Sequence, residues 1–478
     1  MVSQFFADRI REQFGFAPTL QQNELIDALA DFLCEPGDEG LAFLLKGCAG
    51  TGKTSVVAAL VRTLVSFEQN VVLLAPTGRA AKVLSSYAGL PAYTIHRCIY
   101  REKVVGEVDG VFSLNFNRNR NAIYVVDEAS MISNGMGGVS DSNFGSGHLL
   151  EDLFSYVYNG QGNRIIFVGD VAQLPPVGEL VSPALDTRML SSLGLRVSEY
   201  FLTEVVRQEQ QSGILANATN LRLLMPDFNG DFPNIATDGF DDVIKVNGAE
   251  LIEEIASAYS KYGEDDTIVI SRSNKRANLF NNGIRNQVLW REDELSSGDL
   301  IMVVKNNYFW TKDIKELDFI ANGDVAQVKR VRRHSEMYGF RFADVLLFFP
   351  DYEVEVEAKV LLDVLQSPSP SLSAEDNRKL YSEVENDYAD VPTKRERYKK
   401  MKEDVFLNAL QVKFAYAVTC HKAQGGQWSC VFIDRGVLSE DMVNIDFLRW
   451  LYTAFTRATQ KVYLVNWDLP LAPPADYR

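Results

Sequence analysis

Short apolar runs recur along the first part of the chain, each long enough for one buried strand. Four runs show this pattern, at 42–46, 71–75, 122–126 and 164–168. The segments between them are long enough for helices, and 55–64 is compatible with one. Strands alternating with helix-length segments are typical of a parallel sheet. The pattern predicts a first α/β domain over residues 1–200.

The second half of the chain repeats this pattern with an interruption. An apolar strand at 267–271 is followed by a helix-like segment, 274–289, and two further apolar strands lie within 412–465. Between these pieces, three β-rich runs predict a small barrel, at 325–331, 340–348 and 353–361. Residues 373–405 are crowded with charges and predict exposed helices with a solvated face. The predicted division is 1–200, 201–320, 321–410 and 411–478.

A glycine-rich loop follows the first apolar run. The spacing Gly-x4-Gly-Lys-Thr lets a tight backbone turn wrap its N–H groups around a polyphosphate at the start of a helix. Lys53 then reaches the β- and γ-phosphates, and the Thr54 hydroxyl binds Mg²⁺. The loop predicts a site for ATP or GTP rather than an ordinary turn. Its expected nucleotide contacts are Gly47, Gly50, Thr51, Gly52, Lys53, Thr54 and Ser55.

Polar side chains follow two later strands. Asp127 and Glu128 come directly after the run at 122–126. We expect Asp127 to hold Mg²⁺ and Glu128 to deprotonate the attacking water, although a carboxylate pair alone also suits a helix cap. Gln173 follows the run at 164–168, where its amide can sense the γ-phosphate or that water.

Composition narrows the class of protein. The chain has 478 residues, which exceeds what one core usually supports, and no apolar run approaches the ~20 residues of a membrane span. Five cysteines without a CxxC pair suggest free thiols in a reducing cytoplasm, with no membrane association. The formal net charge of −16 argues against loose coating of nucleic acid. It does not exclude a strand held in a basic channel, because charge is screened over ~8 Å.

Eight short motifs follow one another along the chain, and their shared order is informative. They are GCAGTGKT, APTGRAAKVL, TIH, VVDEASM, GDVAQLPPVG, VVRQ, VTCHKAQGGQ and LYTAFTRA. From about residue 16 to 467 the chain resembles the superfamily 1B helicases, first the RecD and Dda type and then the Pif1 type. The resemblance implies two RecA-like parallel-sheet motor domains, with a β-hairpin pin in the first and an SH3-like β-barrel in the second. It also implies ATP and Mg²⁺ as cofactors.

The resemblance assigns further residues. Gln22 reads the adenine edge, and Arg207 and Arg457 contact the γ-phosphate with forked, permanently charged donors. Gln427 stands where related motors often carry an acidic residue, so its contact with the ribose departs from the family pattern. The single-strand contacts implied by the motifs are Pro76, Thr77, His96, Thr419 and His421. For His96, an incidental position at a helix start remains an alternative.

Residues 104–116 predict a β-hairpin. Asp109 and Gly110 sit between β-compatible arms, and Asp-Gly favours a two-residue turn. By resemblance, this hairpin within about 101–120 is the pin that splits the duplex, with Phe112 stacking on a base. A plain surface hairpin is the alternative.

These observations lead to one expectation and two rivals. We expect a monomeric, ATP-dependent 5′→3′ DNA helicase that acts at single-strand/duplex junctions in replication, repair or recombination, alongside proteins of those processes. An RNA helicase of the same superfamily is the first rival, because nothing visibly reads the 2′-OH. The second is an ATP-switched clamp that binds DNA without unwinding it.

Overall fold

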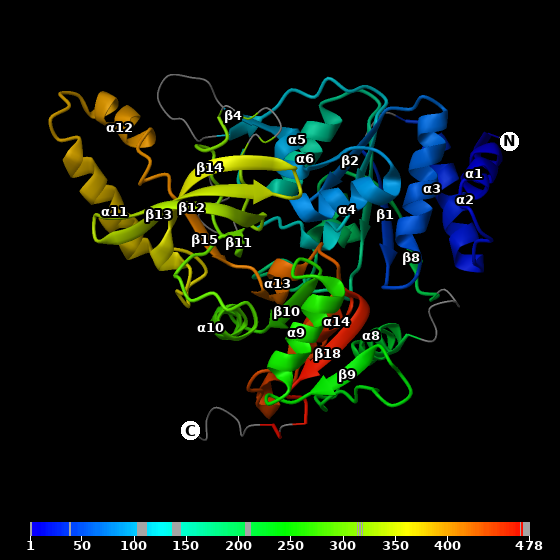
Figure 1. The fold of residues 1–478 in the computed structure, drawn as a ribbon. Helices are drawn as coiled ribbons and strands as arrows, with labels where there is room; N and C mark the ends of the chain where they lie inside the picture. The colour runs from blue at the N-terminus through cyan, green and yellow to red at the C-terminus, as the bar shows by residue number, and fades with distance from the viewer. Residues whose placement is uncertain are drawn as a thin grey trace.

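A computed structural model places two parallel β-sheets and one closed β-barrel in the chain (Figure 1). In that view the first sheet lies at upper right, the second at the bottom and the barrel at upper left. The structure describes residues 2–37, 40–102, 112–135, 145–205, 212–312, 314, 317, 319–468 and 470–471.

The first sheet has six parallel strands in the order β3-β2-β6-β7-β1-β8. Its strands are β1 (Leu41–Gly47), β2 (Val71–Ala75), β3 (Ala92–Thr94), β6 (Ile123–Val126), β7 (Arg164–Gly169) and β8 (Arg196–Leu202). Its helices are α1 (Val2–Glu12), α2 (Leu20–Cys34), α3 (Lys53–Ser66), α4 (Gly78–Ala88), α5 (Ile95–Ile99), α6 (Leu149–Tyr158) and α7 (Thr187–Ser192). The four predicted strands are β1, β2, β6 and β7. The edge strand β8 is largely exposed, so it lacks the apolar run of a central strand.

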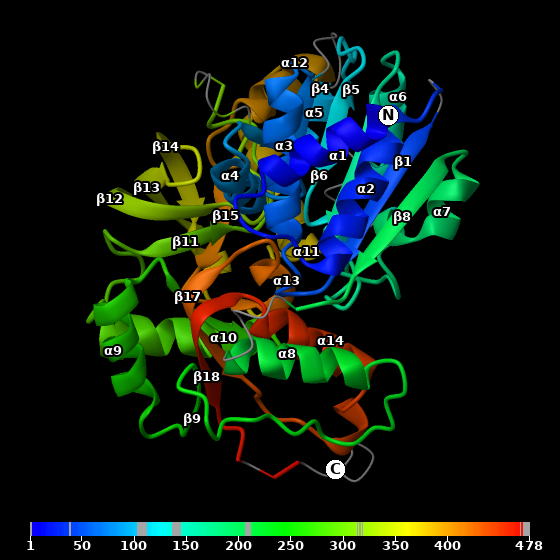
Figure 2. The same ribbon diagram turned by 90° about the vertical axis from the view of Figure 1, so that its right-hand side faces the viewer.

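The second sheet has five parallel strands in the order β16-β10-β17-β18-β9. They are β9 (Val243–Val246), β10 (Thr267–Ser271), β16 (Ala417–Thr419), β17 (Trp428–Asp434) and β18 (Ala458–Val465). The helices are α8 (Gly213–Leu224), α9 (Leu251–Tyr262), α10 (Asn274–Gly283), α13 (Cys420–Ala423) and α14 (Ile445–Phe455). Figures 1 and 2 both show α13 and α14 at the level where the two sheets meet.

The barrel closes through five strands and carries two helices. The strands are β11 (Leu300–Val303), β12 (Val325–Met337), β13 (Phe340–Phe349), β14 (Val354–Leu361) and β15 (Leu410–Phe414). The helices are α11 (Ala374–Asp387) and α12 (Lys394–Lys402). The three predicted β-rich runs are β12 to β14. Two parallel sheets with an inserted barrel confirm the predicted α/β fold class.

The barrel also takes in strands from outside the segment predicted for it. β11 and β15 flank the segment 321–410, and they pair with each other and with β12 and β14. Their short apolar runs resemble those of the second sheet, so only long-range pairing reveals where they belong. The division of the chain into domains stays a prediction.

The hairpin predicted at 104–116 is described at its arms. β4 (Tyr100–Glu102) and β5 (Phe112–Leu114) pair antiparallel, with Tyr100 opposite Leu114. Residues 103–111, which include the predicted turn, lie outside the described residues. The five cysteines are all described and unpaired, as expected.

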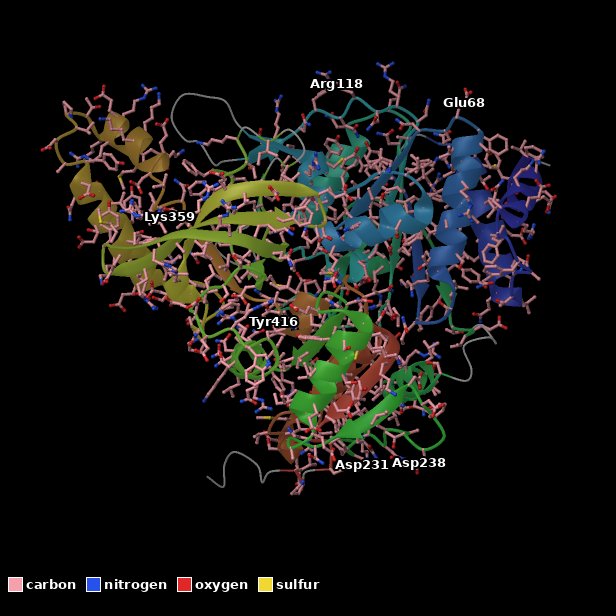
Figure 3. All side chains as sticks on the ribbon, viewed as in Figure 1. Glu68, Arg118, Asp231, Asp238, Lys359 and Tyr416 are labelled. Atoms are coloured by element: carbon pink, nitrogen blue, oxygen red, sulfur yellow. The ribbon has the colours of Figure 1, made fainter. Side chains whose placement is uncertain are left out.

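A buried ion network joins the barrel to the second sheet. Asp299, which directly precedes β11, has no exposed surface and accepts two hydrogen bonds from Arg285, of 2.9 and 3.0 Å. Arg291 and the Tyr416 hydroxyl also donate to Asp299, over 3.2 and 3.1 Å. Figure 3 shows Tyr416 where the barrel meets the second sheet. Burial, together with Asp299, raises the pKa of Tyr416. The carboxylate of Asp299 therefore fixes the orientation of three side chains.

We expect Asp299→Asn to lower the free energy of unfolding by about 3 kcal/mol, because it leaves the buried Arg285 without its opposing charge. Urea denaturation followed by circular dichroism measures this. The control is Glu357→Gln, which breaks an exposed pair with Arg332 and should cost under ~1 kcal/mol. Equal, small losses in both variants would show that Asp299 does not stabilise the junction.

Candidate active site between the two sheets

The glycine-rich loop joins β1 to α3. Gly50 and Gly52 adopt left-handed conformations, with φ of 73° and 78°, which side-chain-bearing residues rarely adopt. A Cβ at Gly47 would lie 2.8 Å from both Cγ and Cδ of Lys53. The loop therefore requires glycine at these positions, for conformation at two and for space at the third.

Lys53 folds back onto its own loop. Its Nζ donates to the carbonyls of Gly47 and Cys48, over 2.8 Å each. The Thr51 hydroxyl donates to the same Cys48 carbonyl, over 2.8 Å. Thr54 is exposed at the start of α3, and Ser55 is half-buried. The loop carbonyls thus accept hydrogen bonds from the ammonium group that a polyphosphate would attract.

Gln22 ties helix α2 to this loop. Its Oε1 accepts from the backbone N–H of Thr19 in a capping box, over 2.9 Å. Its Nε2 donates to the Thr51 carbonyl, over 3.0 Å, and the side chain is buried. Both ends of the amide therefore have partners within the protein. The adenine-reading role stays a prediction, because it requires at least one of these bonds to exchange.

Asp127 and Glu128 follow β6 beside the loop. Asp127 accepts from the Tyr87 hydroxyl and from the backbone N–H of Glu128. Burial and the neighbouring Glu128 raise the pKa of Asp127 to about 6, against the opposing effect of Lys53. Glu128 has a left-handed backbone, with φ of 50°. A desolvated carboxylate of this kind is strongly stabilised by a nearby cation.

The donor set fits a magnesium ion held mainly through substrate. Among the described residues no three acidic, histidine or cysteine side chains gather as a metal cluster. Mg²⁺ bound with a nucleotide uses only one or two protein oxygens, together with phosphates and water. The half-buried Asp127 carboxylate and the exposed Thr54 hydroxyl supply oxygens of that kind.

Gln173 follows β7 at the same sheet edge. Its side chain is buried, and its Oε1 has no hydrogen-bond partner among the described residues. An unpaired buried acceptor is costly, which suggests a ligand that donates to it. A water molecule near the γ-phosphate would meet this need.

Arg457 reaches toward Glu128 from the second sheet. It follows α14, is 3% exposed, and its Nη1 lies 3.6 Å from Glu128 Oε1. The same guanidinium donates to the carbonyls of Thr453 and Gly426, over 3.3 Å each. We call the part built on the six-stranded sheet the first lobe and the part built on the five-stranded sheet the second lobe. The structure thus brings Glu128 and Arg457 together across the two lobes. Arg207 lies outside the described residues.

A second set of contacts across the lobes was missed in the sequence. The Tyr452 hydroxyl accepts from the Ala49 N–H of the loop, over 2.9 Å, and donates to the buried Asp170. The Thr453 hydroxyl accepts from the N–H of Leu174, over 2.9 Å. Tyr452 and Thr453 belong to the LYTAFTRA motif. Thr453 and Tyr452 lie only four and five residues before Arg457 in the same motif, and this proximity in the sequence was the available signal.

The proposed strand contacts lie at the ends of short helices in both lobes. Thr77 caps α4, and its Oγ1 accepts from the N–H of Ala80, over 3.2 Å. A Cβ at Gly425 would lie 3.2 Å from that oxygen, so the lobes approach closely here. Pro76 is half-buried. Thr419 immediately precedes α13, and His421 is exposed on that helix.

The positions of the remaining predicted residues say less about their proposed roles. His96 is half-buried on α5, where burial lowers its pKa to about 4, so it is neutral at neutral pH. The side chain of Gln427 is exposed, and its carbonyl accepts from Arg79, over 3.1 Å. Arg79 in turn stacks on Trp428, 4.1 Å from the ring centre. The backbone of Phe112 lies in β5, and its side chain is outside the described residues.

None of the described helices combines the length and apolar character needed to cross a bilayer. This finding agrees with the absence of long apolar runs in the sequence.

Two domain families match separate parts of the chain. Residues 22–223 match an AAA domain, and residues 414–465 match a UvrD-like helicase C-terminal domain. The Pif1 helicases solved in a study of forked double-stranded DNA are 14% identical, with 97% of this chain and 96% of that chain covered and a TM-score of 0.47.

Two of the curated relatives are helicases, and each is matched over only part of its own length. The ATP-dependent RecD2 DNA helicase of Deinococcus radiodurans is 23% identical, over 88% of this chain and 46% of that protein. The ATP-dependent DNA helicase Dda of Enterobacteria phage T4 is 25% identical, over 59% of this chain and 62% of that protein. The chain thus spans about half the length of these relatives. With its ordered motifs and these matches, the chain is similar to the superfamily 1B helicases of the RecD and Dda type.

Proposed function

We propose that the protein is an ATP-dependent DNA helicase. It would move 5′→3′ on single-stranded DNA and unwind duplexes at junctions during replication, repair or recombination. The observation that supports the proposal most is the distance of 3.6 Å between Arg457 Nη1 and Glu128 Oε1. This contact places residues of both lobes at one proposed nucleotide site. A site divided in this way can convert hydrolysis into relative movement of the lobes.

The contacts of the site suggest how ATP would engage it. Lys53 would exchange the Gly47 and Cys48 carbonyls for the β- and γ-phosphates. Arg457 would exchange Glu128 for the γ-phosphate, where its forked donors match phosphate oxygens. Glu128 is then released to accept a proton from the attacking water, and Gln173 Oε1 accepts another hydrogen bond from that water. Mg²⁺, held by Thr54 and Asp127, would neutralise phosphate charge.

Coupling to a strand would use the contacts between the lobes. Thr77, Pro76 and His96 belong to the first lobe, and Thr419 and His421 to the second. Closing the lobes on ATP and opening them after hydrolysis would shift these two groups relative to each other. Alternating grips would then move the strand in one direction. The hairpin of β4 and β5 would separate the duplex at the entrance.

Replacing Lys53 and replacing Glu128 should cause different failures. Lys53→Ala should weaken ATP binding and abolish turnover, because the polyphosphate loses its principal cation. Glu128→Gln should keep ATP bound while slowing hydrolysis by about 10²–10⁴, the usual contribution of a general base. Nucleotide binding and steady-state turnover are measured separately. Hydrolysis by Glu128→Gln at the wild-type rate would rule out the proposed role of Glu128.

Tyr452→Phe tests the link between the lobes. It removes the hydroxyl that binds Ala49 and Asp170 but keeps the packed ring. We expect the stimulation of ATPase by single-stranded DNA to fall at least about fivefold, with ATP affinity little changed. Tyr381→Phe on α11, at an exposed tyrosine, is the matched control. If both variants respond to DNA as the wild type does, these bonds do not transmit strand binding.

Strand displacement tests the function as a whole. Matched DNA duplexes with a 5′ or a 3′ tail, and RNA duplexes of the same sequence, are incubated with ATP. We expect displacement of the 5′-tailed DNA alone. Equal displacement of RNA would favour the RNA helicase. ATP-dependent binding without displacement would favour the clamp.

In the same assay, Phe112→Ala serves as a variant of the proposed pin. This variant should retain DNA-stimulated ATPase and lose most strand separation. An aromatic side chain stacked on a base contributes ~1–3 kcal/mol, which is comparable to the ~1.4 kcal/mol that one base-pair step contributes to duplex stability. A parallel fall in both activities would assign Phe112 a different role.

A further inference from the structure

Tyr87 contacts the carboxylate that the proposed magnesium site uses. This tyrosine lies in the last turn of α4, and its hydroxyl donates a hydrogen bond to Asp127 Oδ2. Burial, and then the negative charge of Asp127, raise the pKa of Tyr87 well above its usual value. The hydroxyl therefore keeps its proton at neutral pH and stays a hydrogen-bond donor. Tyr87 takes no direct part in the proposed hydrolysis, so this contact needs a reason of its own.

The two oxygens of the Asp127 carboxylate accept from donors of different origin. Oδ1 accepts from the backbone N–H of Glu128, over 2.8 Å, and Oδ2 accepts from Tyr87. An ionised carboxylate offers about four lone-pair sites, so both oxygens keep capacity for a metal ion or its water. The Glu128 N–H belongs to the next residue of the chain and follows Asp127 wherever it moves. The Tyr87 hydroxyl comes from another element, so the position of α4 decides whether this donor reaches Asp127.

One face of α4 packs on the first sheet and carries Tyr87. Ala80, Leu84 and Tyr87 are spaced by four and three residues, so they share a face of the helix. Ala80 and Leu84 are buried. Leu84 and the ring of Tyr87 belong to the same apolar cluster as Val125 of β6, the strand that ends just before Asp127. The ring is thus anchored independently of the hydroxyl, and phenylalanine would keep this packing.

Another face of α4 contacts the barrel. Tyr352, in the turn between β13 and β14, lies so close to Gly78 that a Cβ there would collide with the tyrosine hydroxyl. Lys82 Nζ donates to the Pro350 carbonyl of the same turn, over 2.8 Å, and lies 3.6 Å from Asp351. Figures 1 and 2 both show α4 between the barrel and α3. The barrel and the first sheet therefore hold α4 from two sides.

The start of α4 carries a proposed strand contact. Thr77 caps this end, and Gly425 of the second lobe approaches the Thr77 side chain there. The helix has 11 residues and is about 16 Å long, so Thr77 and Tyr87 lie at its opposite ends. A short helix moves as one rigid element and carries a displacement from one end to the other. A shift at Thr77 would therefore change the hydrogen bond at Asp127.

We propose that Tyr87 is a positioning residue for the magnesium site, and that it links the orientation of Asp127 to strand binding at the other end of α4. This inference rests on the proposed helicase function, which supplies both the metal ion and the strand. Hydrogen-bond partners behind a metal-binding carboxylate orient it, and their loss typically weakens metal binding by about 10–100-fold. With α4 engaged by a strand, the Tyr87 hydroxyl holds Asp127 in the orientation that suits the metal-bound nucleotide.

The test removes the hydroxyl alone, in Tyr87→Phe. The matched control is Tyr158→Phe, at a tyrosine that is also half-buried in the first lobe. Its hydroxyl donates to the carbonyl of Leu41, over 2.7 Å, at the end of β1 opposite the glycine-rich loop. Calorimetry measures the affinity for a non-hydrolysable ATP analogue in Mg²⁺ and in EDTA, each with and without single-stranded DNA. The ratio of the two affinities, here the magnesium factor, requires no turnover. A thermal melt verifies that each variant folds.

We expect the magnesium factor to fall about tenfold in Tyr87→Phe, with the affinity in EDTA unchanged, and to stay at the wild-type value in the control. Single-stranded DNA should raise the factor at least about fivefold in the wild type and in the control, but not in Tyr87→Phe. An unchanged factor, or an equal loss of affinity in EDTA, would overturn the positioning role. A DNA effect that persists in Tyr87→Phe, or is missing from the wild type, would overturn the link to the strand. Wild-type binding that ignores Mg²⁺ would instead overturn the proposed function, and this inference with it.

Discussion

The contact of Tyr452 with the glycine-rich loop is the constraint on which the rest of the site depends. One hydroxyl accepts from the Ala49 N–H and donates to Asp170, so a single side chain of the second lobe joins two segments of the first. Burial raises the pKa of Asp170, and the hydrogen bonds from Tyr452 and the Ala172 N–H oppose that rise. Any rotation of one lobe on the other must break or carry this contact. The loop, the end of β7 and α14 are therefore mechanically connected.

The charged groups of the site share a second property, which is that each has a partner inside the protein. Lys53 is held by loop carbonyls, Arg457 lies beside Glu128, and Asp127 accepts from Tyr87. Each partner is weaker for its charge than a phosphate or a magnesium ion would be. Binding a nucleotide would then exchange partners rather than bury bare charges. Gln173 Oε1 differs, because it has no partner to give up among the residues that the structure describes.

Local patterns predicted those parts of the molecule that local chemistry determines. The glycine-rich loop, the carboxylates after β6 and the central strands follow from spacing and apolar runs. The sequence could not show that β11 and β15 enter the barrel, because their partners are distant in the chain. Nor could it show that Gln22 bonds to Thr51, or that Tyr452 reaches Ala49. Such contacts arise only when segments far apart pack together. The roles assigned to the site residues stay predictions for the same reason.

The fold changes what the negative net charge implies for DNA binding. A formal charge of −16 opposes binding to DNA at long range, yet screening limits that effect to about 8 Å at physiological salt. Within such a distance, local arrangement matters more than the sum. Arg79 stacked on Trp428 and the basic residues of α12 are separate cationic features in an acidic chain. For the proposed helicase, acidic surfaces would repel DNA from unproductive sites, so basic surfaces would restrict where DNA docks.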